Sequence, residues 1–262
     1  MDIAYERRGE GTPLVLIHGI AHRWQAWEPV LDELAMHHDV IAIDLPGFGQ
    51  SPRPPGRMPA SVPAFAAFLL PFLAELGLDR PHVAGNSLGG GLALELAAAG
   101  HARSATAFSP AGFATRSEAW LALGILVQHR AVTYAPESLI RRMVATPRGR
   151  RISMGMIMSR PHALTPDRAI GDALAMRRGK GFAPIARALR GYEFRDAPEV
   201  PVTIAWGEHD KILLYRQAER ARRRLPEALH VRLSGCGHVP MGDDPALVAK
   251  TILETTAAAE AD

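Results

Sequence analysis

The sequence predicts a doubly wound, mostly parallel α/β sheet with an inserted helical cap. Three observations favour this fold class. Short apolar or β-branched runs alternate with longer amphipathic segments, Gly, Pro or Asp bounds each apolar run, and the alternation is interrupted once, in the middle of the chain. The 262 residues are 47% hydrophobic, which is enough for a sizeable buried core. A disordered chain is therefore not expected.

Five short runs are typical of buried parallel strands, because they are apolar or β-branched and end at turn-forming residues. They are residues 14–18, 40–44, 82–85, 104–108 and 200–206, and residues 230–233 supply a final strand. Amphipathic patterns predict helices at 24–37, 61–76, 88–99, 216–224 and 244–255, the last with Asp-Pro at its start. Helices between consecutive strands favour a parallel sheet covered on both faces.

The stretch from about residue 113 to 197 has helical patterns but no convincing strand, and it holds five of the nine methionines. We expect a helical cap at 113–197, inserted into one core domain formed by 1–112 and 198–262. Met154, Met156 and Met158 lie at a spacing that suits neither a clean helix nor a long strand. Flexible thioethers commonly line adaptable apolar pockets, and ordinary core packing is the alternative.

The net charge of +3 is unevenly distributed. Residues 113–195 contain 15 Lys and Arg against 5 Asp and Glu, a net of +10, so the remainder has 15 against 22, a net of −7. A basic block of this kind can steer anionic substrates, lie against an acidic surface, or solvate an exposed helical layer. Nucleic acid is not an expected partner, because aromatic residues are not interleaved with the basic ones.

The first residues of the chain lack the apolar core of a signal peptide, and the longest apolar run, residues 119–127, is too short to span a bilayer. We therefore expect a cytoplasmic protein without a membrane span. The single cysteine, Cys236, excludes an internal disulfide and a cysteine-rich metal site, which agrees with a reducing compartment. The sequence leaves the oligomeric state open.

Ser87 lies between Gly85 and Gly89, after an apolar run and before a helical one. This is the pattern of a nucleophile elbow, in which side chains two residues before and after the serine would collide with the flanking backbone. Such a turn lifts the hydroxyl clear of the sheet and places the Leu88 N–H at a helix N-terminus, where it can stabilise an oxyanion. A Gly-rich connection without chemistry is the alternative for the motif alone.

An activated serine needs a base within hydrogen-bond reach and a carboxylate that orients the base. His238 is in a Gly-rich loop directly after the last strand, and Asp210 follows the strand before it, which gives the chain order Ser, Asp, His. Glu208 and Asp243 compete with Asp210. Glu208 lies too close to its strand end to reach across easily, and Asp243 belongs to the turn that starts the last helix.

The second oxyanion donor is expected from the Ile20 N–H, in the loop after the first strong strand, where Gly19 permits a tight turn and His18 holds the loop by hydrogen bonds. This chemistry requires no metal and no organic cofactor. The residues that we expect to line the substrate pocket are His22, Trp24, Asn86, Met154, Met158 and Val239.

Five motifs together resemble the α/β-hydrolase superfamily. They are His18-Gly19, Asp44-Leu-Pro-Gly-Phe-Gly-Gln-Ser, Gly85-Asn-Ser-Leu-Gly, Gly207-Glu-His-Asp and Gly237-His-Val-Pro, and their order and spacing match across nearly the whole chain. The resemblance implies the α/β-hydrolase fold, with a Ser87-His238-Asp210 triad beneath a helical cap. Serine at the elbow argues against the haloalkane dehalogenase and epoxide hydrolase branches, which attack with a carboxylate.

The prediction for function is hydrolysis of a small-molecule carboxylic ester through an acyl-enzyme. Three alternatives remain. Carbon–carbon hydrolases of the meta-cleavage type are similar in the elbow and cap but usually have Trp where this chain has Val239. Cofactor-free haloperoxidases, or perhydrolases, favour an aromatic residue where this chain has Asn86. Some members of the superfamily are slow-turnover ligand-binding or signalling proteins.

Overall fold

The computed structural model describes residues 2–261, and its centre is a seven-stranded sheet in the order β1-β3-β2-β4-β5-β6-β7. Neighbouring strands are parallel except for β1, which pairs antiparallel with β3. The mostly parallel α/β sheet that the sequence predicts is confirmed. The strands are β1 (Tyr5–Arg8), β2 (Pro13–Ile17), β3 (Asp39–Ile43), β4 (His82–Asn86), β5 (Ser104–Phe108), β6 (Val202–Gly207) and β7 (Leu229–Leu233).

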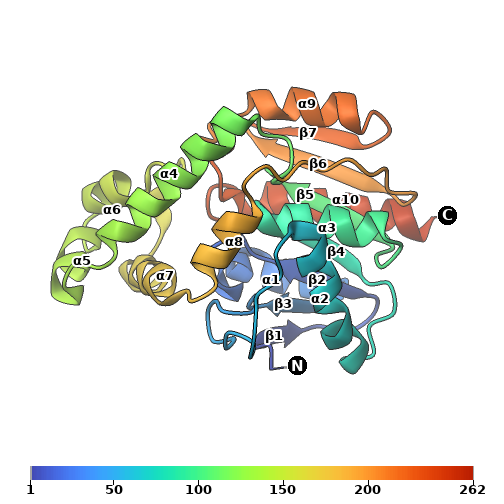
Figure 1. The fold of residues 1–262 in the computed structure, drawn as a ribbon, viewed down its shortest axis with the longest axis horizontal. Coiled ribbons are helices and arrows are strands. Elements are labelled where there is room, and N and C mark those ends of the chain that lie inside the picture. The colour runs from blue at the N-terminus through green and yellow to red at the C-terminus, as the bar shows by residue number, and fades with distance from the viewer. Residues whose placement is uncertain (1, 262) are drawn as a thin grey trace.

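Helices cover both faces of this sheet (Figure 1). The helices α2 (Val62–Glu75) and α3 (Leu88–Ala98) pack against each other on one face, and α1 (Glu28–Ala35) and α10 (Pro245–Glu260) pack together on the other. Successive strand residues point to opposite faces, so Val15 and Ile17 belong to one apolar cluster while Leu14 and Leu16 belong to the other. This double burial explains why the central strands are apolar throughout.

The helices start where side chains can satisfy the free N–H groups of the first turn. Ser61 accepts a hydrogen bond from the Ala64 N–H at the start of α2, and Asp244 accepts one from the Leu247 N–H at the start of α10. The last helix continues to Glu260, five residues beyond the predicted end, because the run of alanines after Thr256 favours helix as strongly as the residues before it. The helix α9 (Arg216–Arg224) has the predicted bounds.

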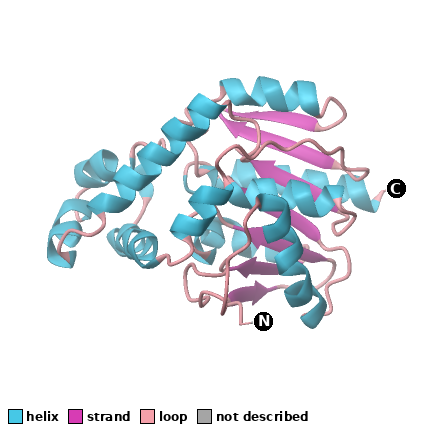
Figure 2. Cartoon of the chain, viewed as in Figure 1, coloured by secondary structure: helices cyan, strands magenta, loops and turns pink. Residues whose placement is uncertain are grey.

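Between β5 and β6 the chain forms helices only: residues 109–201, all of which are described, contain no strand. These helices are α4 (Arg116–Val132), α5 (Glu137–Val144), α6 (Pro147–Met154), α7 (Pro166–Arg178) and α8 (Phe182–Ala188), with a 3-10 turn at Pro161–Ala163. We call residues 113–197 the helical segment. The helices α4 to α7 project beyond the ends at which the arrows of β6 and β7 point (Figures 1 and 2). None of the helices within residues 2–261 combines the length and the hydropathy that crossing a bilayer requires.

Candidate active site

Ser87 forms the sharp junction between β4 and α3. Its φ of +58° and ψ of −113° lie outside the regions that side-chain-bearing residues normally adopt. A Cβ on Gly85 would lie 2.0 Å from the Gly89 carbonyl oxygen, and a Cβ on Gly89 would lie 2.1 Å from the Ile17 carbonyl oxygen. Both glycines are therefore required for space, which is the reason that the sequence pattern suggested.

His238 and Asp210 meet from two different loops at the same edge of the sheet. The distance from His238 Nδ1 to Asp210 Oδ2 is 2.7 Å, and both side chains are buried. The other carboxylate oxygen of Asp210 accepts hydrogen bonds from the N–H groups of Ile212 and Leu213, each at 2.8 Å. With the carboxylate as acceptor, Nδ1 carries the imidazole proton, so the lone pair of a neutral ring lies on Nε2.

The loop that carries His238 is fixed by its own main chain. The N–H groups of His238 and Val239 donate to the Ile157 carbonyl oxygen at 2.8 and 3.2 Å. Asn86 Nδ2 donates to the His238 carbonyl oxygen at 2.8 Å and to the Phe108 carbonyl oxygen at 3.2 Å. The residue next to Ser87 thus ties the histidine loop to the elbow. The sequence suggested that Asn86 lines the pocket, whereas its amide is buried against main chain.

The two competing carboxylates have other partners. Glu208 forms an ion pair with Arg232, and this hydrogen-bonded pairing lowers the pKa of Glu208. Asp243 accepts three main-chain hydrogen bonds, at 2.6 to 3.0 Å, from the N–H groups of Ser159, Arg160 and Gly237. Both therefore stabilise loops, and neither contacts the His238 imidazole.

Two main-chain donors lie beside Ser87. Among the described residues, neither the Ile20 N–H nor the Leu88 N–H has a hydrogen-bond acceptor. Leu88 is the first residue of α3, where the N–H groups have no partner within the helix. The loop of Ile20 touches the elbow, since a Cβ on Gly19 would lie 3.2 Å from the Ser87 Cβ. Two free donors next to one hydroxyl are the arrangement that an oxyanion hole requires.

His18 holds the Ile20 loop in place. Its Nδ1 donates to the Gly19 carbonyl oxygen at 2.7 Å, and its Nε2 accepts from the Leu45 N–H at 2.9 Å. This neutral tautomer uses both ring nitrogens, and burial lowers the pKa of His18 to about 3. Asp44 supports the same region by accepting from the N–H groups of Trp24 and Gln50 at 2.6 and 2.7 Å.

Two cavities lie near these groups. The first, the serine cavity, lies under α4 and is lined by Ser87 and Ile20 together with Leu123, Leu126, Ile212 and Leu213. The second, the methionine cavity, lies among α4 to α7 and is lined mostly by apolar side chains, four of them methionines. Four of the six predicted pocket residues line it: His22, Met154, Met158 and Val239. Trp24 lines neither cavity.

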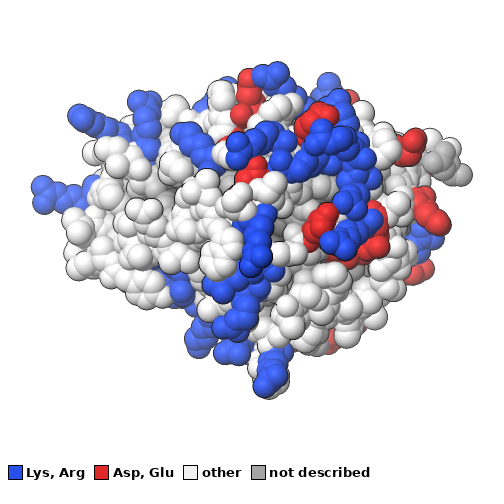
Figure 3. Space-filling model, turned by 45° about the horizontal axis from the view of Figure 1, so that its top comes forward, with Lys and Arg blue, Asp and Glu red and all other residues white. Residues whose placement is uncertain are grey.

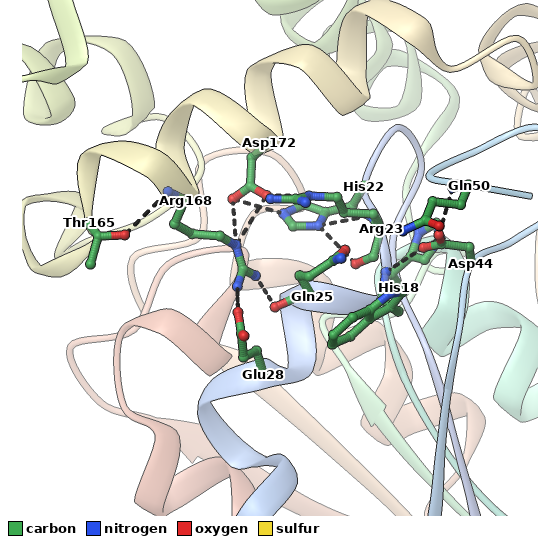
Figure 4. A network of polar contacts seen from close by, with 11 residues as sticks. His18, His22, Arg23, Gln25, Glu28, Asp44, Gln50, Thr165, Arg168 and Asp172 are labelled. Carbon is green, nitrogen blue, oxygen red and sulfur yellow. Dashed lines mark hydrogen bonds and ion pairs between the residues drawn. The ribbon is translucent and has the colours of Figure 1, made fainter. Parts of the chain in front are cut away.

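A network of ion pairs joins α7 to the loop after β2 (Figure 4). Asp172 contacts Arg23 Nε and Arg168 Nε, each at 3.2 Å, and lies 3.9 Å from His22 Nε2. Arg168 Nη1 also binds Glu28 at 2.7 Å. Burial lowers the pKa of His22 more than the nearby Asp172 carboxylate raises it. The sequence does not predict this network, because Asp172 lies 149 residues from Arg23 and Arg168 lies 140 residues from Glu28, and no local pattern joins them.

One group of potential metal ligands occurs within residues 2–261, and it is remote from Ser87. His38, His82 and Glu260 have ligand atoms within 4.8 Å of one another. His38 precedes β3 and His82 begins β4, so the group lies at the amino ends of the strands, whereas Ser87 follows the carboxyl end of β4. This group therefore has no part in chemistry at the elbow.

Comparisons with known proteins give the family. Residues 14–251 match the model of the Alpha/beta hydrolase family. The uncharacterized protein Rv2715 of Mycobacterium tuberculosis is 30% identical over 281 residues, covering 99% of this chain and 80% of that protein. A 2-hydroxy-6-oxo-2,4-heptadienoate hydrolase of Pseudomonas putida is 42% identical over 92 residues, 34% of this chain and 33% of that protein.

Solved structures agree on the fold. A putative lipase from Acinetobacter baumannii superposes with a TM-score of 0.80 at 23% identity, covering 99% of this chain and 89% of the other. An esterase from Thermogutta terrifontis gives a TM-score of 0.75 at 22% identity, with coverages of 98% and 93%. With the family model spanning most of the sequence, the chain belongs to the Alpha/beta hydrolase family.

Proposed function

We propose that this protein is a serine hydrolase that cleaves small carboxylic esters through an acyl-enzyme. Ser87 is the nucleophile, His238 is the general base and Asp210 orients the imidazole. The observation that carries this proposal is the 2.7 Å contact between His238 and Asp210, in a loop that Asn86 ties to the strained serine. Burial of all three side chains supports it, because a water-poor site strengthens each electrostatic interaction.

The reaction follows from these positions. Nε2 of His238 takes the proton of Ser87 as Oγ attacks the ester carbonyl, and the Ile20 and Leu88 N–H groups stabilise the oxyanion. The imidazolium, stabilised by Asp210, then protonates the leaving alcohol as the carbon–oxygen bond breaks. A water molecule, deprotonated by the same imidazole, attacks the acyl-enzyme, and the departing Ser87 oxygen recovers its proton from His238. The products are one carboxylic acid and one alcohol.

The helical segment serves in this proposal as a cap over the site, inserted between the core parts 1–112 and 198–262. The serine cavity and the methionine cavity offer two separate apolar spaces for the acyl and alcohol parts of an ester. Ile20 lines the serine cavity, while the next residues, Ala21 and His22, line the methionine cavity. A medium-length acyl chain or an aromatic group fits such linings, since apolar surfaces with few polar groups favour apolar ligands.

The test uses p-nitrophenyl esters graded by acyl length, with Ser87→Ala beside the wild-type chain. We expect kcat to fall by about 10⁴-fold or more, because the triad acts as a unit. Ser234→Ala is the matched control: it removes a hydroxyl from an exposed position in the histidine loop and leaves turnover unchanged. Full turnover by the Ser87→Ala protein would overturn the proposal.

A second candidate is hydrolysis of a carbon–carbon bond in a dienone-type acid. The 42% identity over 92 residues to a 2-hydroxy-6-oxo-2,4-heptadienoate hydrolase favours it, although that match spans one third of either protein. The two candidates share Ser87 and differ in substrate. If a 2-hydroxy-6-oxo-dienoate is cleaved with a higher kcat/KM than every ester in the series, the assignment moves to carbon–carbon hydrolysis.

A further inference from the structure

The helix α4 is apolar on its outer face as well as its inner face. Ala122, Leu123 and Leu126 are buried, as expected for the face that packs on the protein. The outward face, which we call the α4 face, consists of Trp120, Leu121, Gly124, Val127, Gln128, Ala131 and Val132, all of them exposed. At about 100° per residue these positions span an arc of roughly 140°. A solvated helix carries charged or polar side chains on such an arc.

Apolar exposure is concentrated in this part of the molecule. Among the described residues, eleven large hydrophobic side chains are exposed, and eight of them lie between Trp120 and Met156. The α4 face contributes four, each 53% to 55% exposed, and Tyr134 continues the face beyond the helix end. Isolated exposed apolar residues need no explanation, but a contiguous group of this kind marks a surface that binds something.

The surroundings of the α4 face are basic, and their charges are not neutralised within the chain. Seven arginines of the helical segment make neither an ion pair nor a side-chain hydrogen bond with any described residue: Arg116, Arg142, Arg148, Arg151, Arg178, Arg187 and Arg190. Four of the six acids of the segment are already in ion pairs, and Asp167 and Asp196 are the two that are not. In Figure 3 the left end of the molecule, where α4 to α7 lie, is largely white with blue at its margin and shows no red.

We propose that the α4 face docks on an anionic lipid surface. Exposed apolar side chains on a helix gain free energy by entering the boundary between headgroups and acyl chains, and nearby arginines gain by approaching lipid phosphates. The Arg190 guanidinium lies 4.8 Å from the centre of the Trp120 ring, so an amphipathic ring and a cation come from the same edge of the face. Both side chain types are suited to the membrane–water interface.

The same charges disfavour a second copy of this chain as the occupant. A two-fold symmetric contact places the same patch of both protomers together, so the unpaired arginines of one copy would face those of the other. The required negative charges must come from outside the chain, because few acids of the segment are free. A lipid headgroup layer supplies them over an extended area, which suits helices that project from one end of the molecule (Figure 1).

The α4 face lies next to the methionine cavity of the helical segment. Val132 belongs to the α4 face and also lines the methionine cavity, so the face borders that cavity. The inference stands independently of ester hydrolysis, since it depends on surface composition alone. Its test is therefore a binding measurement.

The experiment measures cosedimentation of the wild-type chain with vesicles of ether-linked lipids, which contain no ester bond. Vesicles of phosphatidylglycerol mixed with phosphatidylcholine are compared with vesicles of phosphatidylcholine alone. We expect binding to the anionic vesicles, a decrease in binding as salt is raised, and a shift of tryptophan emission to the blue that is lost in Trp120→Phe. Phosphatidylcholine alone should retain little protein.

Paired variants locate the contact. The double variant Leu121→Gln with Val127→Gln should weaken binding to anionic vesicles by about tenfold or more, because two side chains lose their apolar contact. The control, Met36→Gln with Leu229→Gln, also replaces two exposed apolar side chains by glutamine, but outside the helical segment. These side chains are 72% and 55% exposed, and the control should bind as the wild type does. All four positions are exposed, and circular dichroism checks that both variants are folded.

Three results would overturn the proposal. The first is no binding to anionic vesicles, or equal binding to both vesicle types. The second is an equal loss in the two double variants. The third is a concentration-dependent dimer, seen by analytical ultracentrifugation and abolished by Leu121→Gln with Val127→Gln, which would assign the face to a second copy. None of these outcomes affects the Ser87→Ala result, so failure here is distinct from failure of the proposed hydrolase activity.

Discussion

Asp210 is oriented before any substrate arrives. Two main-chain N–H groups hold its Oδ1, and this leaves Oδ2 directed at His238 Nδ1. Glu208 is only two residues away but faces outward to Arg232. The two acids therefore differ in the direction in which their side chains point, and the turn after β6 sets that direction. Each acid can be tested by replacing its carboxylate with the corresponding amide.

Asp210→Asn should lower kcat by about 10⁴-fold near neutral pH while KM changes little. An asparagine amide that donates to Nδ1 favours the tautomer with its proton on Nε2, and that nitrogen then cannot accept the serine proton. Steady-state kinetics on a p-nitrophenyl ester measure the effect. Glu208→Gln is the control and should stay within about twofold of the wild type. Comparable losses in both variants would mean that Asp210 does not have the orienting role.

The hydrogen-bond partners of the Asn86 side chain could not be predicted from the sequence. The elbow pattern identifies Ser87 and its glycine neighbours, because the close approaches at Gly85 and Gly89 are consequences of local backbone geometry. The direction of the Asn86 side chain depends on the main chain of His238, which lies 152 residues further along the sequence. No local pattern contains that contact. The assignment of Asn86 to the substrate pocket stays a prediction, whereas its hydrogen bond to the histidine loop could not be predicted.

At the scale of elements, α7 connects the helical segment to the core. Its Asp172 binds Arg23 of the loop after β2, and its Arg168 binds Glu28 at the start of α1 (Figure 4). The loop after β2 also carries the Ile20 N–H. The side chains of Asp172 and Arg168 are largely buried, at 10% and 14% exposure. An ion pair of this kind is costly to break, because the remaining charges lose their partner in a poorly solvated place.

Asp172→Asn should lower the free energy of unfolding by about 1–3 kcal/mol and raise KM for esters. Without the carboxylate, the Arg23 and Arg168 guanidinium groups face each other, and the loop after β2 loses its link to α7. Urea unfolding and steady-state kinetics measure the two effects. Glu137→Gln breaks an exposed pair with Arg141 four residues away and should cost no more than about 0.5 kcal/mol. A similarly small effect for Asp172→Asn would show that apolar packing alone holds α7.

The edge strand β1 is the element that the sequence did not predict. Its residues Tyr-Glu-Arg-Arg are alternately exposed and half-buried, so they lack the continuous apolar run by which the central strands were found. Arg7 pairs with Asp39 across the sheet, and this hydrogen-bonded contact raises the pKa of Arg7. Strands buried on both faces can be read from composition, whereas an edge strand depends on the neighbour to which it pairs.

For the molecule as a whole, the sequence predicted the architecture because strands and helices alternate with the same pattern several times. All five helices and all six strands that were predicted with bounds occur at nearly the expected positions, apart from the 3-10 turn at Trp24–Trp27 that precedes α1. The arrangement of the helices between β5 and β6 could not be predicted. It depends on long-range contacts, such as Arg130 of α4 with the carbonyl oxygens of Met176 and Arg177.

Buried neutral histidines should make the whole molecule sensitive to acid. Burial lowers the pKa of His18 to about 3 and that of His82 to about 4, from an ordinary value of 6.5. Between these values and pH 6.5 the unfolded chain binds protons that the folded chain does not. Stability therefore rises with pH in that window and is lost as the pH falls below about 6.5. Each such histidine contributes a slope of up to ~1.4 kcal/mol per pH unit.

Buried carboxyl groups act in the opposite sense at lower pH. Burial raises the pKa of Asp44 and Glu95, so these groups take up protons more readily in the folded chain and partly offset the loss. The histidine effect should therefore be clearest between about pH 7 and pH 5, where ordinary carboxyl groups remain ionised. As the pH is lowered from about 7 to about 5, we expect the urea concentration at the midpoint of unfolding to fall steadily. A midpoint that is constant, or that rises as the pH falls, would contradict the assignment of His18 and His82 as neutral core groups.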